Sequence, residues 1–263
     1  MNKDFERRFG GISRLYGEQV FARFGQAHVC VVGVGGVGSW AAEALARSGI
    51  GRLTLIDLDN IAESNTNRQI HALGDEYGKA KVLAMAERIL AINPACEVTM
   101  VEEFVDADNL NDLLGQGYDA VLDAIDQTRI KAAMIAWCKR HGIYMVSTGA
   151  AGGQTDPARV RVADLTQTVQ DPLASRVRSL LRKEYGYPRD AKKKFGLEFV
   201  FSDEPIKYPQ QACDSDDVPA APGQGAADAP QGLNCAGFGS SVCVTAVFGF
   251  VAASRILAHF AEL

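Results

Sequence analysis

The chain has 263 residues, of which 47% are hydrophobic and 22% charged, and its formal net charge is −5. This length and composition are typical of one large globular domain and exclude a chain too polar to build a core. The acidic balance excludes a general electrostatic attraction to nucleic acid, so any such binding must depend on a local basic patch.

The first residues and the cysteines bear on the cellular compartment. MNKDFERRFGG contains charges but no apolar run, so it lacks the pattern of a signal peptide. No C-x-x-C pair occurs among the six cysteines, which stand at positions 30, 96, 138, 213, 235 and 243. Such scattered cysteines are typical of reduced intracellular thiols, and we expect a cytoplasmic protein.

The first predicted strand, HVCVVG (28–33), is a nearly continuous apolar run, typical of a parallel strand buried on both faces. The glycine-rich turn VVGVGGVGSW overlaps its end, and Gly33, Gly35 and Gly38 have the spacing G-x-G-x-x-G. Glycines let backbone N–H groups approach a phosphate, and the following helix adds the positive end of its dipole. The spacing alone does not distinguish NAD, FAD and ATP, and a purely structural tight turn also has it.

The middle of the chain alternates strands and helices. Strands are predicted at 52–57, 97–102, 118–124 and 143–148, and helices near 79–92, 108–114 and 128–141. This alternation predicts an α/β fold with a doubly wound, Rossmann-like and mostly parallel sheet.

After about residue 150 the alternation changes. RVRVADL (159–165) and LEFVFS (197–202) predict strands of a C-terminal antiparallel elaboration. The Pro-, Gly-, Ala- and Asp-rich segment 211–232 predicts a flexible loop. We expect residues 1–263 to form a single domain, with a nucleotide-binding half over about 1–150 and a substrate-binding elaboration over about 151–263.

The stretch 233–254 contains no charged residue and is long enough to be a candidate membrane span. Three serines, three glycines, Asn234 and Thr245 lie within it, a composition that favours a helix buried against the sheet. Membrane association through this stretch remains the alternative.

Polar residues after the second strand indicate which nucleotide the glycine turn holds. Asp57 ends that strand and can accept hydrogen bonds from ribose hydroxyls, and Asn65, Arg68, Lys79 and Lys81 follow it. A triphosphate carries about four negative charges, and Arg and Lys beside it also stabilise the charge that develops as pyrophosphate leaves. The cations therefore favour ATP, although Arg68 or Lys81 alone is also typical of a solvated helix surface.

Asp126 follows the fourth strand in VLDAIDQT, at the carboxyl edge where parallel sheets bind ligands. A carboxylate there suits Mg²⁺, which prefers one or two carboxylates together with phosphate oxygens. The alternative is that Asp123 and Asp126 cap the helix that follows.

Four of these motifs together resemble the ubiquitin-activating-enzyme-like (E1-like, ThiF-type) adenylating superfamily: VVGVGGVGSW, LIDLDNIAESNTNRQ, GKAK and VLDAID. Within it, the chain resembles the tRNA threonylcarbamoyladenosine dehydratase family, from about Phe5 to the C-terminal helix. The segments that carry this resemblance are FGGISRLYGE, NTNRQIHAL, INPACEVT, GAAGGQTDP, QDPLASRVR and FGFVA.

The resemblance implies roles for individual residues in binding and turning over ATP. Asp57 would bind the ribose, Asn65 and Arg68 the phosphates, Lys81 would balance the leaving group, and Asp126 would hold Mg²⁺. Arg68, Lys81 and Asp126 are thus the candidate catalytic residues. The remaining positions implied to lie near the nucleotide are Gly33, Gly35, Gly36, Gly38 and Asp59.

The reaction that the resemblance implies takes place on the modified adenosine at tRNA position 37. ATP would convert its threonyl carboxylate to an acyl-adenylate, and the neighbouring carbamoyl group would close a ring with net loss of water. Such intramolecular attack can supply on the order of 7–11 kcal/mol. Alternatives are adenylation of the C-terminus of a ubiquitin-like sulfur carrier and, less favoured, an NAD-dependent oxidoreductase or a binding module.

A basic segment is the predicted contact with tRNA. Residues 176–194 contain eight Lys or Arg and two acidic residues, and they predict contacts to phosphates of the anticodon stem-loop. A solvated charged helix is the alternative. The candidate residues are Arg176, Arg178, Arg182, Lys183, Lys192, Lys193 and Lys194.

Cys235, in LNCAGFG, is a candidate catalytic thiol that would attack the adenylate or accept sulfur from a cysteine desulfurase, as the resemblance implies. A thiol packed at the start of the last helix is the alternative.

The resemblance also implies a homodimer in which an N-terminal Arg serves the partner's ATP. The aligned position here is Gly11, so Arg8 or Arg14 would have to take this role. Without C-x-x-C pairs we expect no structural zinc, and the presence of Na⁺ or K⁺ in a glycine-rich loop is left open.

Overall fold

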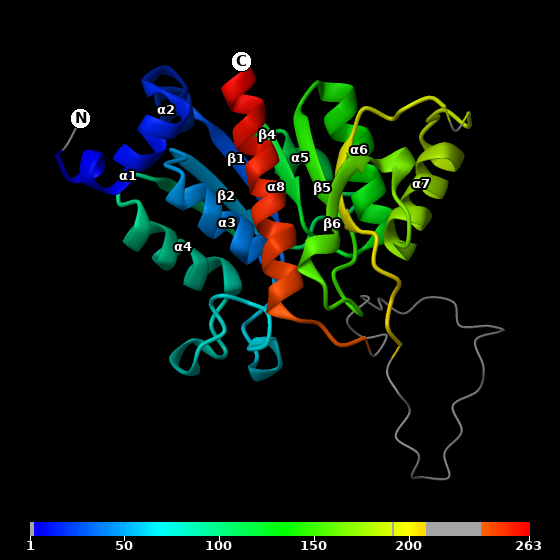
Figure 1. The fold of residues 1–263 in the computed structure, drawn as a ribbon, viewed down its shortest axis with the longest axis horizontal. Helices are drawn as coiled ribbons and strands as arrows, with labels where there is room; N and C mark the ends of the chain where they lie inside the picture. The colour runs from blue at the N-terminus through cyan, green and yellow to red at the C-terminus, as the bar shows by residue number, and fades with distance from the viewer. Residues whose placement is uncertain (1–2, 191, 209–237) are drawn as a thin grey trace, which may run out of the picture.

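A computed structural model describes residues 3–190, 192–208 and 238–263. Within them, seven strands form one sheet in the order β3-β2-β1-β4-β5-β7-β6, with helices on both faces (Figure 1). The strands are β1 (His28–Val32), β2 (Arg52–Ile56), β3 (Glu97–Val101), β4 (Ala120–Asp123), β5 (Tyr144–Thr148), β6 (Val160–Asp164) and β7 (Glu198–Ser202). Neighbouring strands are parallel except for β6, which is antiparallel to β7. The predicted doubly wound, mostly parallel sheet is confirmed.

The helices follow the chain around this sheet. They are α1 (Lys3–Tyr16), α2 (Glu18–Gln26), α3 (Gly38–Arg47), α4 (Lys81–Ile92), α5 (Leu110–Leu114), α6 (Thr128–His141), α7 (Pro172–Glu184) and α8 (Val242–Glu262). The predicted helices near 79–92, 108–114 and 128–141 correspond to α4, α5 and α6.

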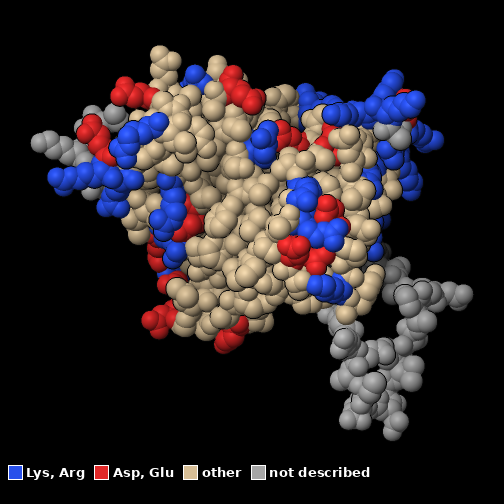
Figure 2. Space-filling model, in the orientation of Figure 1, with Lys and Arg blue, Asp and Glu red and all other residues tan. Residues whose placement is uncertain are grey.

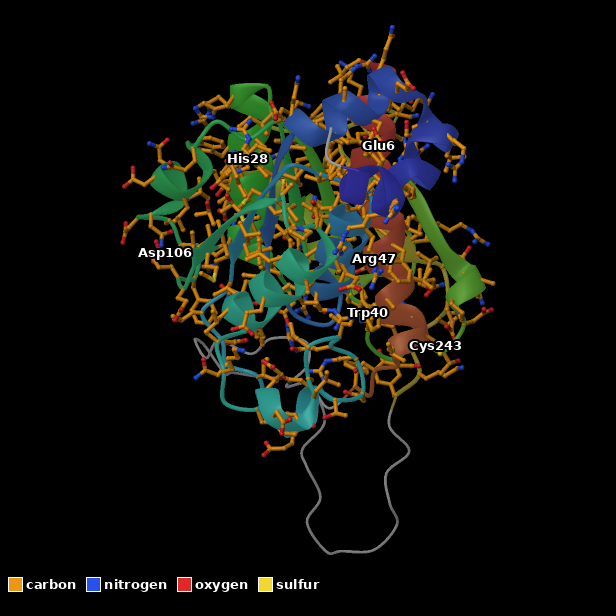
Figure 3. All side chains as sticks on the ribbon, turned by 90° about the vertical axis from the view of Figure 1, so that its left-hand side faces the viewer. Glu6, His28, Trp40, Arg47, Asp106 and Cys243 are labelled. Carbon is orange, nitrogen blue, oxygen red and sulfur yellow. The ribbon has the colours of Figure 1, made fainter. Side chains whose placement is uncertain are left out.

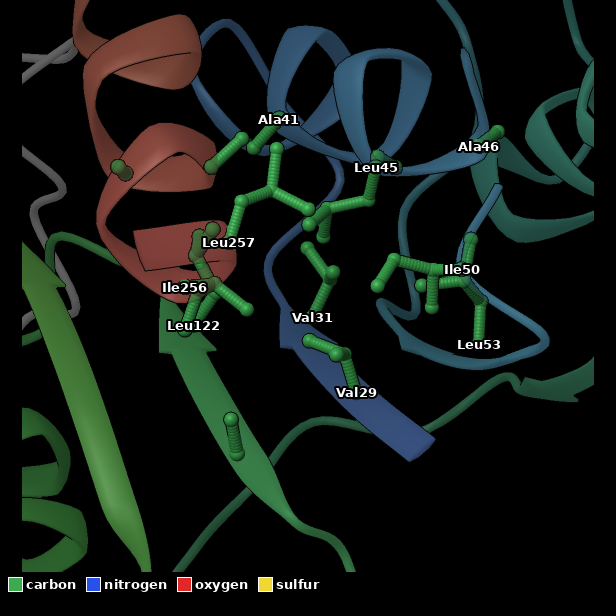
Figure 4. Close-up of a cluster of buried hydrophobic side chains, with 14 of the residues drawn as sticks. Val29, Val31, Ala41, Leu45, Ala46, Ile50, Leu53, Leu122, Ile256 and Leu257 are labelled. Carbon is green, nitrogen blue, oxygen red and sulfur yellow. The ribbon is translucent and has the colours of Figure 1, made fainter. Parts of the chain in front are cut away.

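The alternation of side chains along β1 explains why its sequence is apolar throughout. Val29 and Val31 point into one hydrophobic core, whereas Cys30 and Val32 point into a second core on the opposite face of the sheet. Figure 4 shows the first core, where Val29 and Val31 lie beneath α3 and α8. Side chains of a strand alternate between faces, so a strand covered on both sides must be apolar at every position.

The C-terminal part continues the sheet before it adds the antiparallel strand. β7 pairs in parallel with β5, so only β6, at the edge, runs against its neighbour. The physical reason is α7, which lies between β6 and β7 in sequence and returns the chain so that β7 runs parallel to β5. The predicted antiparallel elaboration is thus limited to one strand pair.

The apolar C-terminal stretch forms α8, whose mean hydropathy is 1.7 and which, among the described residues, is the one helix long and apolar enough to cross a membrane. Half of its apolar window is buried in this structure. A Cβ on Gly249 would lie 2.5 Å from the carbonyl oxygen of Val37, so this glycine lets α8 pack directly on the start of α3. A packed helix is confirmed from Val242 onward, while residues 233–237 lie outside the described ones.

Candidate functional site

The glycine turn between β1 and α3 is shaped by its first and last glycines. Gly33 has φ +84°, a backbone conformation that favours glycine. A Cβ on Gly38 would lie 1.7 Å from the carbonyl oxygen of Gly33. Any side chain at Gly38 would therefore displace the turn, which explains both ends of the G-x-G-x-x-G spacing.

The two middle glycines serve a different purpose, because they leave the outer side of the turn open. The nearest atom to a Cβ on Gly35 would be Gln69 Nε2 at 3.8 Å. A Cβ on Gly36 would lie 3.2 Å from Cγ and Cδ of Arg68. The Arg68 side chain therefore crosses the turn at the point where the sequence predicts phosphates.

Asp57, directly after β2, holds the start of the glycine turn in place through its carboxylate. Its Oδ2 accepts a hydrogen bond of 2.7 Å from the backbone N–H of Val34, and its Oδ1 accepts one of 2.9 Å from Asp59 N–H. Burial raises the pKa of Asp57, and the nearby Lys81 charge opposes this shift. A carboxylate can accept about four hydrogen bonds, so both oxygens retain capacity for ribose hydroxyls.

Lys81, the first residue of α4, lies beside the same carboxylate. Its Nζ is 2.6 Å from Asp59 Oδ2 and 3.9 Å from Asp57 Oδ1, and the Lys81 side chain is buried. The structure thus brings Asp57, Asp59 and Lys81 into one cluster. Asp59, the nearer of the two carboxylates, balances most of the Lys81 charge.

Asn65 and Arg68 lie in the loop between β2 and α4. The Asn65 side-chain oxygen accepts a hydrogen bond from Ala62 N–H at 3.1 Å, which closes a short 3₁₀ turn. Arg68 Nη1 donates to the Ser64 carbonyl at 2.8 Å, and burial lowers the pKa of Arg68. Trp40 Nε1, on α3, donates to the Arg68 carbonyl at 2.9 Å and so ties this loop to the glycine turn.

His71 supports the turn but was not singled out from the sequence. Its Nε2 lies 2.9 Å from the Val34 carbonyl oxygen, which can only accept, so Nε2 carries the proton. Burial lowers the pKa of His71 to about 4, and the ring is therefore neutral at pH 7. The peptide groups of Val34 are held from both sides, by Asp57 and by His71. The feature of the sequence that could have pointed to His71 is its place inside NTNRQIHAL, one of the segments that carry the family resemblance.

Two aspartates near the end of β4 have different surroundings. Asp123 is fully buried, and its Oδ2 lies 2.7 Å from Lys131 Nζ and accepts a hydrogen bond of 2.6 Å from Ser147 Oγ. Asp126 is half-buried, and no described side chain pairs with it. The alternative that Asp123 and Asp126 cap the next helix is wrong, because the N-cap of α6 is Gln127.

The turn that carries Asp126 lies against the glycine turn. A Cβ on Gly33 would lie 3.0 Å from Ile125 Cγ2 and 3.1 Å from the carbonyl carbon of Ala124. The ends of β1 and β4, which are neighbours in the sheet, therefore bring a carboxylate close to the predicted phosphate site. Within the described ranges no group of three His, Cys, Asp or Glu side chains could hold a metal, so Mg²⁺ would depend on Asp126 and on phosphate oxygens.

Some basic residues of 176–194 are exposed, whereas others contact backbone carbonyls or an aromatic ring. Arg178 donates from Nη1 to the carbonyls of Leu165 and Thr168, each at 3.0 Å, and burial lowers its pKa. Arg182 lies over the Phe195 ring, 5.4 Å from its centroid. The exposed ones are Arg176, Lys183, Arg189, Lys192, Lys193 and Lys194, and Figure 2 shows Lys and Arg gathered in this region at the upper right.

Two candidate features fall outside the described residues. These are Cys235 and the predicted loop 211–232, both within 209–237. Of the N-terminal arginines, Arg8 donates from Nη1 to the carbonyls of Ala91 and Ile92 at the end of α4, while Arg14 is exposed.

Comparison with known proteins gives one consistent family. The ThiF family model matches residues 10–261. The tRNA threonylcarbamoyladenosine dehydratase of Escherichia coli K12 is 52% identical over 254 residues, covering 96% of this chain and 93% of that protein. Its Haemophilus influenzae counterpart is 48% identical over 257 residues, with coverages of 97% and 93%. The crystal structure of the E. coli enzyme in complex with ATP has a TM-score of 0.86 at 48% identity and covers 98% of this chain and 96% of that one.

Proposed function

The chain belongs to the ThiF family, and from this premise we propose that it catalyses the ATP-dependent dehydration of N6-threonylcarbamoyladenosine at position 37 of tRNA. The observation that carries the proposal is the 52% identity to a dehydratase of that name over nearly the whole of both chains. The glycine turn, with Asp57, Arg68 and Lys81 around it, supports the same conclusion because it provides a site for a nucleoside triphosphate.

The first step is attack of the threonyl carboxylate on the α-phosphorus of ATP, with pyrophosphate as the leaving group. Asp57 accepts hydrogen bonds from the ribose, and Arg68, above Gly36, compensates charge on the phosphates. Lys81 exchanges its contact with Asp59 for one with the nucleotide. Mg²⁺ held by Asp126 would neutralise phosphate charge when bound.

The second step is intramolecular. The carbamoyl group attacks the activated carbonyl, AMP leaves with one oxygen of the former carboxylate, and a ring closes. Because both reacting groups belong to one substituent, the protein needs only to exclude water and hold the substituent in a closing conformation.

The expected partners follow from this substrate. The exposed cations of 176–194 would contact tRNA phosphates, and a tRNA substrate favours the cytoplasm.

We further propose a homodimer, supported by exposed apolar side chains on α8, namely Val242 and Phe250, on a face where Figure 2 shows few charges. Sulfur transfer to Cys235 stays a prediction.

The test uses the purified protein with ATP, Mg²⁺ and tRNA carrying N6-threonylcarbamoyladenosine. Mass spectrometry of the digested nucleosides should show loss of one water, accompanied by AMP and pyrophosphate. The Asp126→Ala variant should lose at least about a hundredfold in turnover, with an unchanged melting temperature because Asp126 pairs with no described side chain.

The alternative is adenylation of the C-terminus of a ubiquitin-like sulfur carrier. No loss of water, together with ATP–pyrophosphate exchange that depends on such a carrier, would favour it and contradict the proposed function.

A further inference from the structure

A hollow of about 440 Å³ opens beside Arg68, between the loop that follows β2 and the residues just before α8. Figure 1 shows this loop, in cyan, next to the start of α8, in orange. Asn67 Nδ2 donates to the Ser240 carbonyl at 2.9 Å and ties the two walls together. The volume is within the range of sites for small organic ligands, about 300–1,000 Å³.

An aromatic pair lies at one wall of the hollow. Phe238 lines it, and the ring centroid of Tyr208 is 5.3 Å from that of Phe238. The backbone around Phe238 is fixed, because Gly153 N–H donates to the Gly239 carbonyl at 2.7 Å. An aromatic ring in the wall of a hollow that polar residues also line is typical of proteins that bind unpaired bases of RNA.

The charges of the hollow favour a neutral base over a phosphate. Glu63 lines it and repels anions, whereas Arg68, the one cation among the described lining residues, extends over Gly36. The hollow and the predicted phosphate site therefore meet at Arg68. A base in the hollow would direct a substituent that carries a carboxylate toward Arg68 and the nucleotide.

We propose that this hollow receives the purine base of the reacting nucleoside, stacked on Phe238, with Asn67 and Ser240 lining its polar side. The proposal rests on the proposed function, since it names where that substrate lies. The base must leave its stack in the anticodon loop to enter, as in other enzymes that act on a base.

The test is fluorescence of an anticodon stem-loop RNA with 2-aminopurine at position 37, whose emission is quenched on stacking. The wild-type protein should quench it, and Phe238→Leu should weaken both quenching and affinity for the RNA about tenfold or more. ATP binding, measured by calorimetry, should stay unchanged. Phe238→Tyr keeps the ring and should restore quenching, and Phe104→Leu, which replaces an exposed aromatic in the loop between β3 and α5, is the matched control.

Two outcomes separate this proposal from the proposed function. If the wild-type protein dehydrates the modified tRNA but Phe238→Leu retains wild-type quenching and KM for tRNA, the base site is wrong and the function stands. If the wild-type protein neither dehydrates the tRNA nor binds the stem-loop, both proposals fail.

Discussion

At the scale of single residues, Val34 shows how the candidate site is made rigid. Its N–H and carbonyl are both bound by buried side chains, Asp57 at 2.7 Å and His71 at 2.9 Å. Together these two contacts hold both peptide groups of Val34, which lead into the glycine turn. Because this backbone is already ordered, nucleotide binding does not lose free energy to ordering the loop.

His71 should make stability depend on pH in a defined window. The pKa of His71 is about 4 in the folded chain and 6.5 when unfolded, so between these values the unfolded state binds more protons and stability rises with pH. The free energy of unfolding should fall by about 2 kcal/mol from this group between pH 7.5 and pH 5. His71→Gln keeps a donor for Val34 without titrating, so urea unfolding at both pH values should show a smaller fall. Equal falls in the two proteins would contradict the assignment.

At the scale of elements, the basic segment extends from the candidate site to the other end of the sheet. α7 begins near the carboxyl end of β5, where Asp171 accepts a hydrogen bond from Ala150 N–H at 3.1 Å. Thirteen helical residues span about 20 Å, and Lys192, Lys193 and Lys194 then precede β7. These lysines would therefore contact RNA well away from the reacting nucleoside.

Replacing Lys192, Lys193 and Lys194 by Ala should weaken tRNA binding through lost phosphate contacts alone. The slope of log K for tRNA binding against the logarithm of the salt concentration should become shallower by about 2–3. ATP affinity and melting temperature should stay constant because all three side chains are exposed. Titrations at several salt concentrations would measure this. A double replacement of Arg7 and Arg52, exposed cations of the N-terminal half, is the control. Unchanged tRNA affinity in the triple variant would remove these lysines from the interface.

The elements that the sequence predicted well are those with a strong periodic or glycine signal. Two features follow directly from the local sequence pattern: the alternation of β1 side chains between the two hydrophobic cores and the turn at Gly33. The parallel pairing of β7 with β5 did not, because strand direction depends on where α7 returns the chain. His71 and Phe238 were missed because their roles depend on contacts between segments far apart in sequence, which no local spacing encodes.

At the scale of the whole molecule, α1 and the glycine turn lie at opposite ends of the sheet. β1 begins two residues after α2 ends and runs toward the turn over five residues, about 17 Å. Figure 3 shows Glu6 of α1 and His28 at one end, and Trp40 nearer the other. An arginine of α1 therefore cannot serve the ATP site of its own subunit, and only a second copy could bring it there.

Arg14 is the better candidate for this role, because Arg8 is engaged with the end of α4. Arg14→Ala and Asp126→Ala should each be nearly inactive alone. When the two variants are mixed in equal amounts and pair at random in a symmetric dimer, half of all dimers carry one subunit of each variant. Each of these dimers has one intact site of two, so the mixture should recover about a quarter of wild-type activity. Dehydration assays after co-refolding would measure it, with each variant refolded alone as the control. Since sites confined to one subunit cannot be repaired by mixing, failure to recover activity would show that Arg14 does not act across the dimer.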